Sequence, residues 1–442
     1  MQIINAWICC VNDNSIEPIF GDITIHDGKI SKIEGKEFVA EKVLRSNENE
    51  KDVLNVKGKV ITIPLVNFHD HFYSMLAKGL PIEGPMDNFH NILKNLWWKV
   101  DRATDEKIIT ASAQSGILDS IKNGVTYIFD HHSSPDTASG SLGLIANVFE
   151  ETGLRGVLCF ETTDRNGEKL ADQGLEENKN FLQNTNFENL NGLLGLHASF
   201  TLSDKSLESA SELMKELNTG IHIHVCEDKI DNELSKKNYK LFPVERLKHF
   251  DLLNDKSILS HGIHLTKSDY ETIGENGSAI AFNPDSNMNN AVGLPDFNSI
   301  PNGIPVLMGT DGMHSNIAKS LKQLFLLLRY TGKSFDESFK MINKVYFDQI
   351  KFVKRFFPDF SFLQKNDNAD FIIWDYVPPT PFTQENFWGH FIYGILESHV
   401  SDVIQNGKIL MKGHSLQIDE EKLLLNIVKE GNRLYNKFAG MN

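Results

Sequence analysis

The chain has 442 residues, of which 44 are Lys or Arg and 59 are Asp or Glu, so its formal net charge is −15. This acidic balance argues against a nucleic-acid backbone or an anionic membrane surface as the partner, and a small molecule is the better expectation. The length allows one large domain with a sizeable core and a smaller second domain.

Cysteine usage and apolar runs indicate the compartment. The four cysteines show neither CxxC spacing nor a secreted disulfide framework. The N-terminus has no basic segment followed by an apolar core, and no run of 18 or more apolar residues is present. We therefore expect a cytoplasmic protein without a membrane span.

The first 60 residues predict antiparallel hairpins. Short β-rich pieces at residues 3–9 and 22–26 are separated by turn sequences, notably at residues 26–29 and 57–59.

From Ile61 onward, apolar strand candidates alternate with longer helical patterns. The eight candidates lie at residues 61–71, 125–130, 156–160, 192–197, 220–225, 257–261, 278–282 and 304–309. Continuous apolar strands between helices are typical of a parallel sheet that is covered on its outside. The pattern predicts an α/β protein with a TIM-like (β/α)₈ barrel over residues 63–367.

The β-rich texture returns after the barrel. Residues 369–375 and 400–413 resemble the N-terminal hairpins, and residues 419–442 have the periodicity of an amphipathic helix. We therefore predict a small β-sandwich domain built from both chain ends, with residues 1–62 as one part and residues 368–442, including the terminal helix, as the other.

The first barrel strand ends in two histidines, His69 and His71. Residues two apart on a strand point to the same face, so both imidazoles would project together from the C-terminal end of the strand, where barrel active sites lie. A pair of surface histidines in a turn is the alternative, so the case for a metal site depends on further ligands.

Two further ligand candidates lie at other strand ends. His224 ends the fifth strand and Asp311 follows the eighth. Barrel closure brings these ends to a common centre, where His69, His71, His224 and Asp311 make a set suited to zinc or ferrous iron with room left for water. The alternative for His224 is a core histidine, and we assign His222 to packing or to support of a ligand.

Glu227 gives the metal site a specific chemistry. It follows His224 by three residues, a spacing that would face away on a continuing strand, so we expect the strand to end or bend there. Its carboxylate could take a proton from a metal-bound water and pass it to a ring nitrogen or leaving amine. His261, at the end of the sixth strand, is predicted to hydrogen-bond that water or the developing tetrahedral oxygen, and ligation of a second ion is the alternative.

Long strings elsewhere give the chain a family resemblance over essentially its whole length. It resembles the amidohydrolase superfamily, in the aminohydrolase branch with cytosine, guanine, S-adenosylhomocysteine and triazine hydrolases, and within that branch the SsnA group of aminohydrolases or chlorohydrolases associated with selenium and purine metabolism. The strings that carry the resemblance are residues 95–102, 130–134, 159–167, 283–293 and 375–381.

The resemblance implies roles for individual residues. It makes His69, His71, His224 and Asp311 the metal ligands, with Asp311 also catalytic, Glu227 the proton shuttle and His261 the water-orienting histidine. It also implies that His197, in a string similar to one in related deaminases, contacts substrate. Relatives with two metals usually bridge them with a lysine from the fourth strand, and residues 192–199 contain none. One divalent ion, Zn²⁺ or Fe²⁺, is therefore expected.

Substrate contacts are predicted beyond the third strand and before the first barrel helix. Glu161 and Arg165 could read the polar edges of a heterocycle, while Trp97 and Trp98 could wall a planar pocket. The alternatives are that the tryptophans belong to a helix core and that Arg165 pairs with Asp164 in a loop. His131 and His132, after the second strand, either touch substrate or cap a helix.

These expectations combine into a hydrolase acting on carbon–nitrogen bonds other than peptide bonds. In this mechanism, metal-bound hydroxide attacks a ring carbon of a purine-like or other N-heterocycle, and ammonia leaves after protonation by Glu227. Two alternatives stay open: removal of chloride or an alkylamine by the same machinery, and a non-catalytic scaffold. Relatives are often dimers or larger, which leaves the oligomeric state of this chain open.

Overall fold

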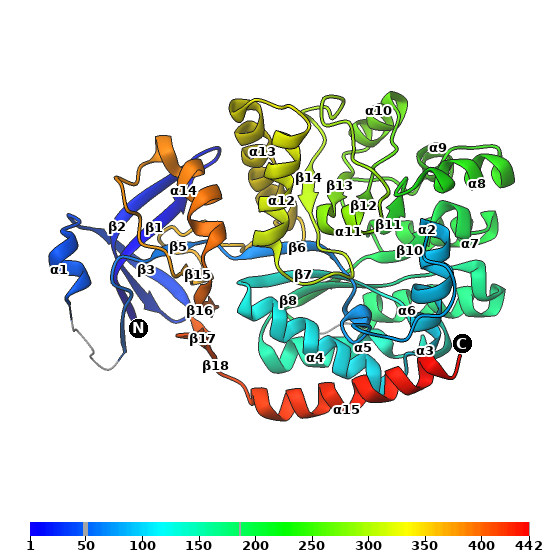
Figure 1. The fold of residues 1–442 in the computed structure, drawn as a ribbon, viewed down its shortest axis with the longest axis horizontal. Coiled ribbons are helices and arrows are strands. Elements are labelled where there is room, and N and C mark those ends of the chain that lie inside the picture. The colour runs from blue at the N-terminus through cyan, green and yellow to red at the C-terminus, as the bar shows by residue number, and fades with distance from the viewer. Residues whose placement is uncertain (47–51, 185–186, 442) are drawn as a thin grey trace. The chain divides into compact units, whose positions relative to one another are not determined.

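The computed structural model describes two compact units (Figure 1). The residues described are 1–46, 52–184 and 187–441. The first unit comprises residues 1–66, 119–126 and 316–419, and the second comprises residues 67–118, 127–315 and 420–442. The domain boundaries predicted after residues 62 and 367 stay predictions.

The first unit contains a nine-stranded mixed sheet to which both ends of the chain contribute. Its strands are β1 (Gln2–Val11), β2 (Ile16–His26), β3 (Lys29–Gly35), β4 (Val53–Asn55), β5 (Val60–Thr62), β15 (Phe371–Trp374), β16 (Val400–Gln405), β17 (Lys408–Lys412) and β18 (Ser415–Leu416). The two chain ends meet where β5 pairs antiparallel with β15, with Ile61 opposite Ile373. The hairpin predicted at residues 26–29 is present, with Asp27 at φ 47° and Gly28 at φ 73° in its turn.

Four helices complete the first unit: α1 (Ala40–Leu44), α12 (Ile317–Tyr330), α13 (Phe335–Val353) and α14 (Phe387–Tyr393). Helix α13 begins with a capping box, in which the Ser334 side chain accepts from the Glu337 amide and Glu337 accepts from the Ser334 amide. The sheet shared by both chain ends confirms the predicted β-rich domain. The long helical stretch predicted after the eighth strand forms α12 and α13.

Parallel strands form the barrel. In chain order they are β6 (Leu65–Asp70), β7 (Val125–His132), β8 (Arg155–Phe160), β9 (Leu190–Gly192), β10 (Leu194–Ala198), β11 (Ile221–Val225), β12 (Ile258–His261), β13 (Ala279–Phe282) and β14 (Val306–Met308). They pair as two sheets, β6-β7-β8-β9 and β10-β11-β12-β13-β14, and β9 and β10 together make the fourth strand.

Backbone hydrogen bonds close both seams between these sheets. The Thr162 amide donates to the Gly195 carbonyl at 3.1 Å, and the Thr310 amide donates to the His69 carbonyl at 3.0 Å. The strands are buried along nearly their whole length, as expected for a parallel sheet covered by helices. The (β/α)₈ prediction is confirmed.

Helices of the second unit follow the strands. They are α2 (Phe89–Ile92), α3 (Trp98–Ala103), α4 (Glu106–Lys122), α5 (Ser141–Thr152), α6 (Glu168–Asn184), α7 (Asp204–Glu216), α8 (Lys229–Tyr239), α9 (Pro243–His249), α10 (Lys267–Glu275), α11 (Pro284–Asn289) and α15 (Glu420–Ala439). A single π-helical stretch, Leu93–Trp97, joins α2 to α3. Such stretches are frequent at functional sites.

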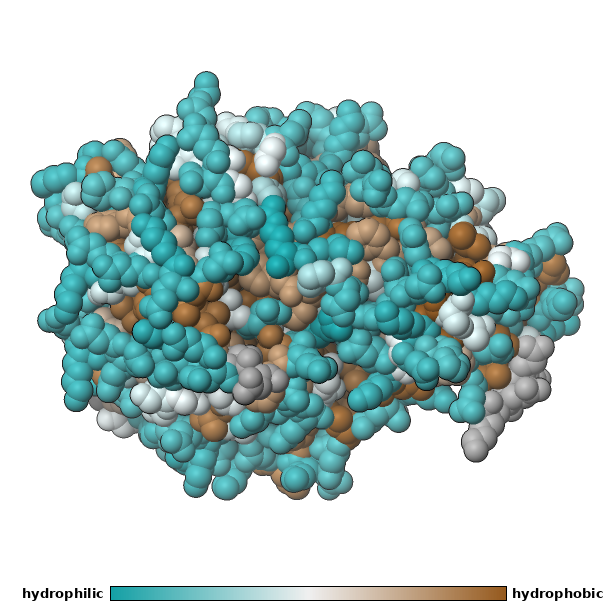
Figure 2. Space-filling view, turned by 180° about the vertical axis from the view of Figure 1, so that it is seen from behind, coloured by the Kyte–Doolittle hydropathy of each residue, from teal (hydrophilic) through white to brown (hydrophobic). Residues whose placement is uncertain are grey.

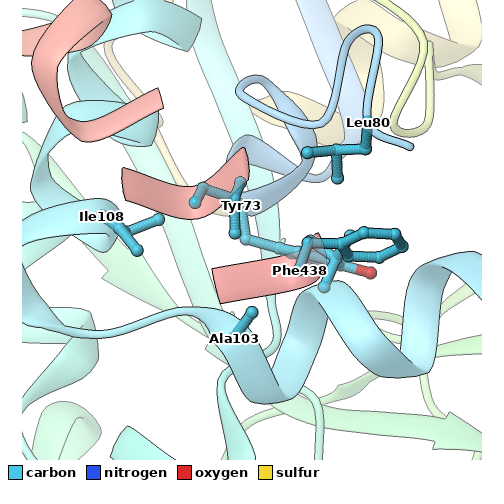
Figure 3. Packing of buried hydrophobic residues seen from close by; sticks show 7 residues of the cluster. Tyr73, Leu80, Ala103, Ile108 and Phe438 are labelled. Atoms are coloured by element: carbon cyan, nitrogen blue, oxygen red, sulfur yellow. The ribbon is translucent and has the colours of Figure 1, made fainter. Parts of the chain in front are cut away.

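Terminal helix α15 packs on the segment that follows the first barrel strand. Its Leu434 and Phe438, both fully buried, form an apolar cluster with Tyr73, Val100 and Ala103 among others (Figure 3). Two basic residues of the same helix, Arg433 and Lys437, bond to the Asp105 carboxylate. The helix therefore fixes residues 73–108.

Helix α15 exposes Leu424, Leu425 and Val428 close together. Hydrophilic residues cover most of the face shown in Figure 2. Within the described parts of the chain, no helix has the length and apolar character needed to cross a membrane.

Candidate active site

Three strand ends carry an unusual backbone turn. Cys226, directly after β11, has φ 52°; His261, the last residue of β12, has φ 73°; and Asp311, beyond β14, has φ 55°. Non-glycine residues rarely adopt positive φ, and strain of this kind concentrates at functional sites. The turn at Cys226 is the bend predicted from the His224–Glu227 spacing, and the Glu227 side chain lines the same pocket as His224.

The four predicted ligands lie together. His71 Nε2 is 3.1 Å from Asp311 Oδ1 and 3.1 Å from His224 Nε2, and His69 Nε2 is 3.8 Å from Asp311 Oδ1. The His69 and His224 ring centroids are 5.0 Å apart. Side chains from the ends of β6 and β11 and from Asp311, three residues after β14, thus converge although 242 positions separate His69 from Asp311.

Each histidine turns one nitrogen toward the centre because the other is occupied. His71 Nδ1 donates to the His131 carbonyl at 2.6 Å, and His224 Nδ1 donates to the His197 carbonyl at 2.9 Å. This fixes the tautomer and leaves Nε2 with a lone pair, as in histidines that ligate metals.

His69 has a different support. Its Nδ1 lies 2.9 Å from His222 Nε2, which is also 3.2 Å from Ser260 Oγ. Burial first, and the nearby His71 and His261, lower the pKa of His222 to about 3, so the ring is neutral and its Nε2 can accept from His69. The roles predicted for His222 were packing and support of a ligand, and its hydrogen-bonding contact with His69 corresponds to the second.

These residues fit a divalent cation. Among the described residues, the buried Nε2 of His69 has no hydrogen-bond partner, which is costly unless something else binds it. Burial lowers the pKa of His71, but its bond to Asp311 outweighs burial and raises the pKa to about 9, so a proton neutralises Asp311 where a cation would otherwise do so. Three imidazoles and a carboxylate are a donor set typical of zinc or ferrous iron.

Glu227 and His261 face each other beside the ligand cluster. Glu227 Oε2 is 3.4 Å from His261 Nε2, and the Glu227 amide donates to Asp231 Oδ2 at 3.1 Å. Burial and, after it, the charge of Asp311 raise the pKa of Glu227 well above its usual range. A carboxyl group with a raised pKa is suited to both accepting and returning a proton near neutral pH.

Helix α11 and the residue after it bond to three of the predicted catalytic groups. Ser286 Oγ donates to Asp311 Oδ2 at 2.5 Å, Asn287 Oδ1 lies 2.8 Å from His261 Nδ1, and Asn290 Nδ2 donates to Glu227 Oε1 at 3.3 Å. The sequence analysis missed these roles. Their only signal was that residues 283–293 form one of the strings that carry the family resemblance.

One pocket is lined by three of the four ligand candidates, His71, His224 and Asp311, and by the predicted substrate residues. It encloses about 700 Å³, including the part open to solvent. His197, Glu161, Arg165 and Trp97 all line it together with His71, His224, Glu227 and Asp311. Trp98 lines it as well, so the tryptophans are not confined to a helix core.

The ion pair predicted as an alternative for Arg165 is wrong. Arg165 pairs with Asp101 and Glu161, and its guanidinium lies 5.2 Å from the Trp98 ring centroid. Asp164 instead accepts from the Ser203 amide at 2.7 Å and from Ser206 Oγ at 2.9 Å, because it faces the start of α7. Asp101 was missed because it comes from α3, where no spacing rule links it to the third strand.

The two histidines after the second strand have different surroundings. His131 belongs to the buried histidine cluster with His69, His71 and His224, and its Nδ1 is 3.5 Å from Glu161 Oε2. His132 Nε2 lies 2.9 Å from Ser134 Oγ.

A model of the amidohydrolase family matches residues 60–410. The chain belongs to this family. An amidohydrolase relative named 5'-deoxyadenosine deaminase, from Methanococcus aeolicus, is 29% identical over 96% of this chain and 98% of its own length. A second, named 5-methylthioadenosine/S-adenosylhomocysteine deaminase, from Caldicellulosiruptor saccharolyticus, is 28% identical over 94% of each chain.

Solved amidohydrolase structures share the fold. A zinc-bound adenosine deaminase from Xanthomonas campestris superposes with a TM-score of 0.77 at 18% identity, over 98% of this chain and 98% of that chain. The barrel and the β-rich part from both chain ends are therefore common to the two proteins.

Proposed function

We propose that this amidohydrolase is a deaminase that removes the exocyclic amine of an adenine nucleoside by hydrolysis and releases ammonia. One observation carries the proposal: the buried Glu227 carboxyl lies 3.4 Å from His261 beside a convergent set of three imidazoles and Asp311. The names of the relatives, deaminases of 5'-deoxyadenosine and of 5-methylthioadenosine or S-adenosylhomocysteine, support the substrate class.

His69, His71, His224 and Asp311 would hold one divalent ion, for which we propose Zn²⁺ rather than Fe²⁺. When bound, such an ion lowers the pKa of a coordinated water toward neutrality and so supplies a nucleophile. The supports from His222 and from the two backbone carbonyls hold the three imidazoles in one orientation, with Nε2 toward the centre.

Glu227 moves the protons. Its carboxylate accepts one proton from the attacking water and delivers it to the ring nitrogen, where that proton stays. It then accepts the remaining proton of the added hydroxyl group and delivers it to the amine, which leaves as ammonia when the carbon–nitrogen bond breaks. His261 hydrogen-bonds the oxygen on which charge develops, and Asn287 fixes its ring by a 2.8 Å contact with Nδ1. Asn290 keeps the Glu227 carboxylate aimed into the pocket.

The pocket walls suit a planar heterocycle. Trp97 and Trp98 line one side, and the His197 imidazole lies on another, with its Nδ1 held 2.7 Å from Thr201 Oγ1. Aromatic walls with a few fixed polar groups are typical of small-molecule sites. His197 would therefore contact a ring nitrogen.

Release of chloride by the same machinery is the second candidate. An amino group must gain a proton to leave as ammonia, whereas chloride leaves without a proton. The placement of Glu227 within reach of both His261 and the ligand cluster favours amine release. A non-catalytic scaffold would be expected to have lost ligands, yet all six predicted metal and catalytic positions keep their residues.

The test follows ammonia and chloride from zinc-loaded protein. We expect ammonia from adenosine and 5'-deoxyadenosine and no chloride from a chlorotriazine. Glu227→Gln should lower kcat about 10²- to 10⁴-fold, a typical contribution of general acid–base catalysis, while zinc stays bound. A Glu227→Gln protein that deaminates as fast as the parent would contradict the shuttle, and chloride release without ammonia would favour the second candidate.

A further inference from the structure

The charges around the pocket are unbalanced. Arg165 is the only arginine or lysine among the described residues that line it. The carboxylates that line it are those of Asp101, Glu161, Glu227, Asp231 and Asp311.

The single cation is already paired. Arg165 Nη2 bonds to Asp101 Oδ2 and lies 3.4 Å from Glu161 Oε1. Both carboxylates are only 2% exposed, and the arginine side chain is 10% exposed and lies over Trp98. Even with Glu161 protonated, Asp101 alone balances the guanidinium.

The imidazoles nearest to this wall also face one of its carboxylates. His131 Nδ1 is 3.5 Å from Glu161 Oε2, and His197 Nε2 is 3.9 Å from Glu161 Oε1. Neither ring is therefore a free cation that a ligand could pair with. A ligand in the pocket therefore meets no free cation on the wall formed by Asp101, Glu161 and Arg165.

Packing holds the Asp101 side of the wall in place. Its neighbours Val100 and Ala103 belong to the apolar cluster with Leu434 and Phe438. Arg165 could bind a substrate anion only by giving up Asp101, which would leave a buried carboxylate without its partner. Breaking one partner of such a pair is strongly unfavourable.

We infer that this pocket selects substrates by charge: it accepts nucleosides whose substituent away from the reacting amine is neutral or cationic overall, and it rejects nucleosides whose substituent there has a net negative charge. The inference rests on the proposed deaminase function and specifies its substrate class. The residues that set the selection are Asp101 and Glu161, which turn the only pocket arginine into part of a neutral or anionic wall.

The experiment compares four adenine ribonucleosides that differ only at the 5' position: 5'-deoxyadenosine (neutral), 5'-amino-5'-deoxyadenosine (cationic), adenosine-5'-carboxylate and adenosine 5'-monophosphate. Ammonia release gives kcat/KM for each with zinc-loaded protein, and calorimetry gives the Kd of each. We expect both anionic compounds to have kcat/KM at least about 30-fold below 5'-deoxyadenosine, since like-charge contacts cost several kcal/mol in a buried site.

Asp101→Asn keeps the shape of the side chain and removes its charge. In this variant, the ratio of kcat/KM for 5'-deoxyadenosine to kcat/KM for adenosine-5'-carboxylate should fall at least about fivefold. Glu161→Gln should have the same effect and is a second variant in case the first fails to fold. Asp136→Asn is the matched control. Asp136 forms an ion pair with Arg102 outside the pocket, so this substitution should leave the ratio unchanged.

The outcomes separate this inference from the proposed function. Anionic and neutral compounds that react and bind within threefold of each other would overturn the charge selection but keep the deaminase. A ratio that stays unchanged in folded Asp101→Asn and Glu161→Gln proteins would overturn the role of this wall. If none of the four compounds reacts or binds, the adenine-nucleoside function fails, and the inference fails with it.

Discussion

The floor and the wall of the pocket are held by different forces. The floor consists of strand ends from β6, β11 and β12 and the turn after β14, which are locked by ladder and seam hydrogen bonds. The wall is formed by Asp101, Glu161 and Arg165, and its Asp101 comes from residues 73–108, which are held by side-chain packing on α15 and by the bonds of Asp105 to the terminal helix. The comparison predicts that the candidate metal site and the wall can be disturbed separately, one through its hydrogen bonds and the other through its apolar contacts.

Removing the Phe438 side chain should disturb the wall and leave the floor intact. Phe438→Ala deletes a fully buried ring from the cluster and should lower the free energy of unfolding by about 3–5 kcal/mol. The KM for a nucleoside should rise while the zinc content per chain stays the same. Chemical denaturation and metal analysis measure the two effects.

The same helix offers a control. Tyr435→Ala removes a ring that is 45% exposed, so it should change the stability by no more than about 0.5 kcal/mol. Loss of zinc in Phe438→Ala would show that floor and wall are one cooperative unit.

Replacing His222 should weaken zinc binding at the floor and leave the wall unchanged. His222→Leu removes the acceptor for His69 Nδ1, and we expect zinc affinity to fall about 10- to 100-fold, as for other residues that support metal ligands. His222→Gln can place an amide oxygen near the lost Nε2 and should recover most of the affinity. Equal zinc affinity in His222→Leu and the parent, measured by chelator competition, would contradict this support.

Asn290 allows a finer test of the floor, because its amide donates to Glu227. This hydrogen bond lowers the pKa of Glu227, against burial and Asp311, which raise it. Asn290→Ala should therefore raise that pKa. Because the ionised carboxylate accepts the first proton, the acidic limb of the kcat/KM profile should move to higher pH. If the acidic limb stays in place or moves to lower pH, it does not report the ionisation of Glu227.

The smallest expected effect concerns Asp105, which bonds the segment of residues 73–108 to helix α15. Partial burial raises the pKa of Asp105, but the bonds from Lys437 and Arg433 outweigh it and lower the pKa to about 2. A lowered folded-state pKa contributes stability above the unfolded-state value of about 3.9, and this contribution is lost as the pH falls toward 2. Asp105→Asn should therefore be less stable by under about 1 kcal/mol at neutral pH, with the difference vanishing in acid.

How much the sequence could predict follows the same division. His69, His71, His224 and Asp311 were accessible because strand alternation and barrel closure place side chains at fixed positions. The bend before Glu227 followed from the same rule, and Cys226 provides it. Strand geometry thus determines most of the floor.

Side-chain contacts that join distant elements, in the wall and in the floor, could not be predicted in the same way. Asp101 reaches Arg165 across 64 positions of chain, and Asn290 reaches Glu227 across 63. Such contacts depend on how helices pack rather than on any period along the sequence. The alternative that Arg165 pairs with Asp164 is wrong for this reason. The two residues are adjacent in sequence, but the packing of α3 gives Arg165 the partner Asp101, and the start of α7 gives Asp164 the partner Ser203.

The most direct measurement is a crystal structure of zinc-loaded protein with anomalous data collected at the zinc edge. The account predicts a single peak about 2.0–2.2 Å from Nε2 of His69, His71 and His224 and from a carboxylate oxygen of Asp311. A peak that lacks any of these four ligands, or a second peak bound by His261, would contradict it.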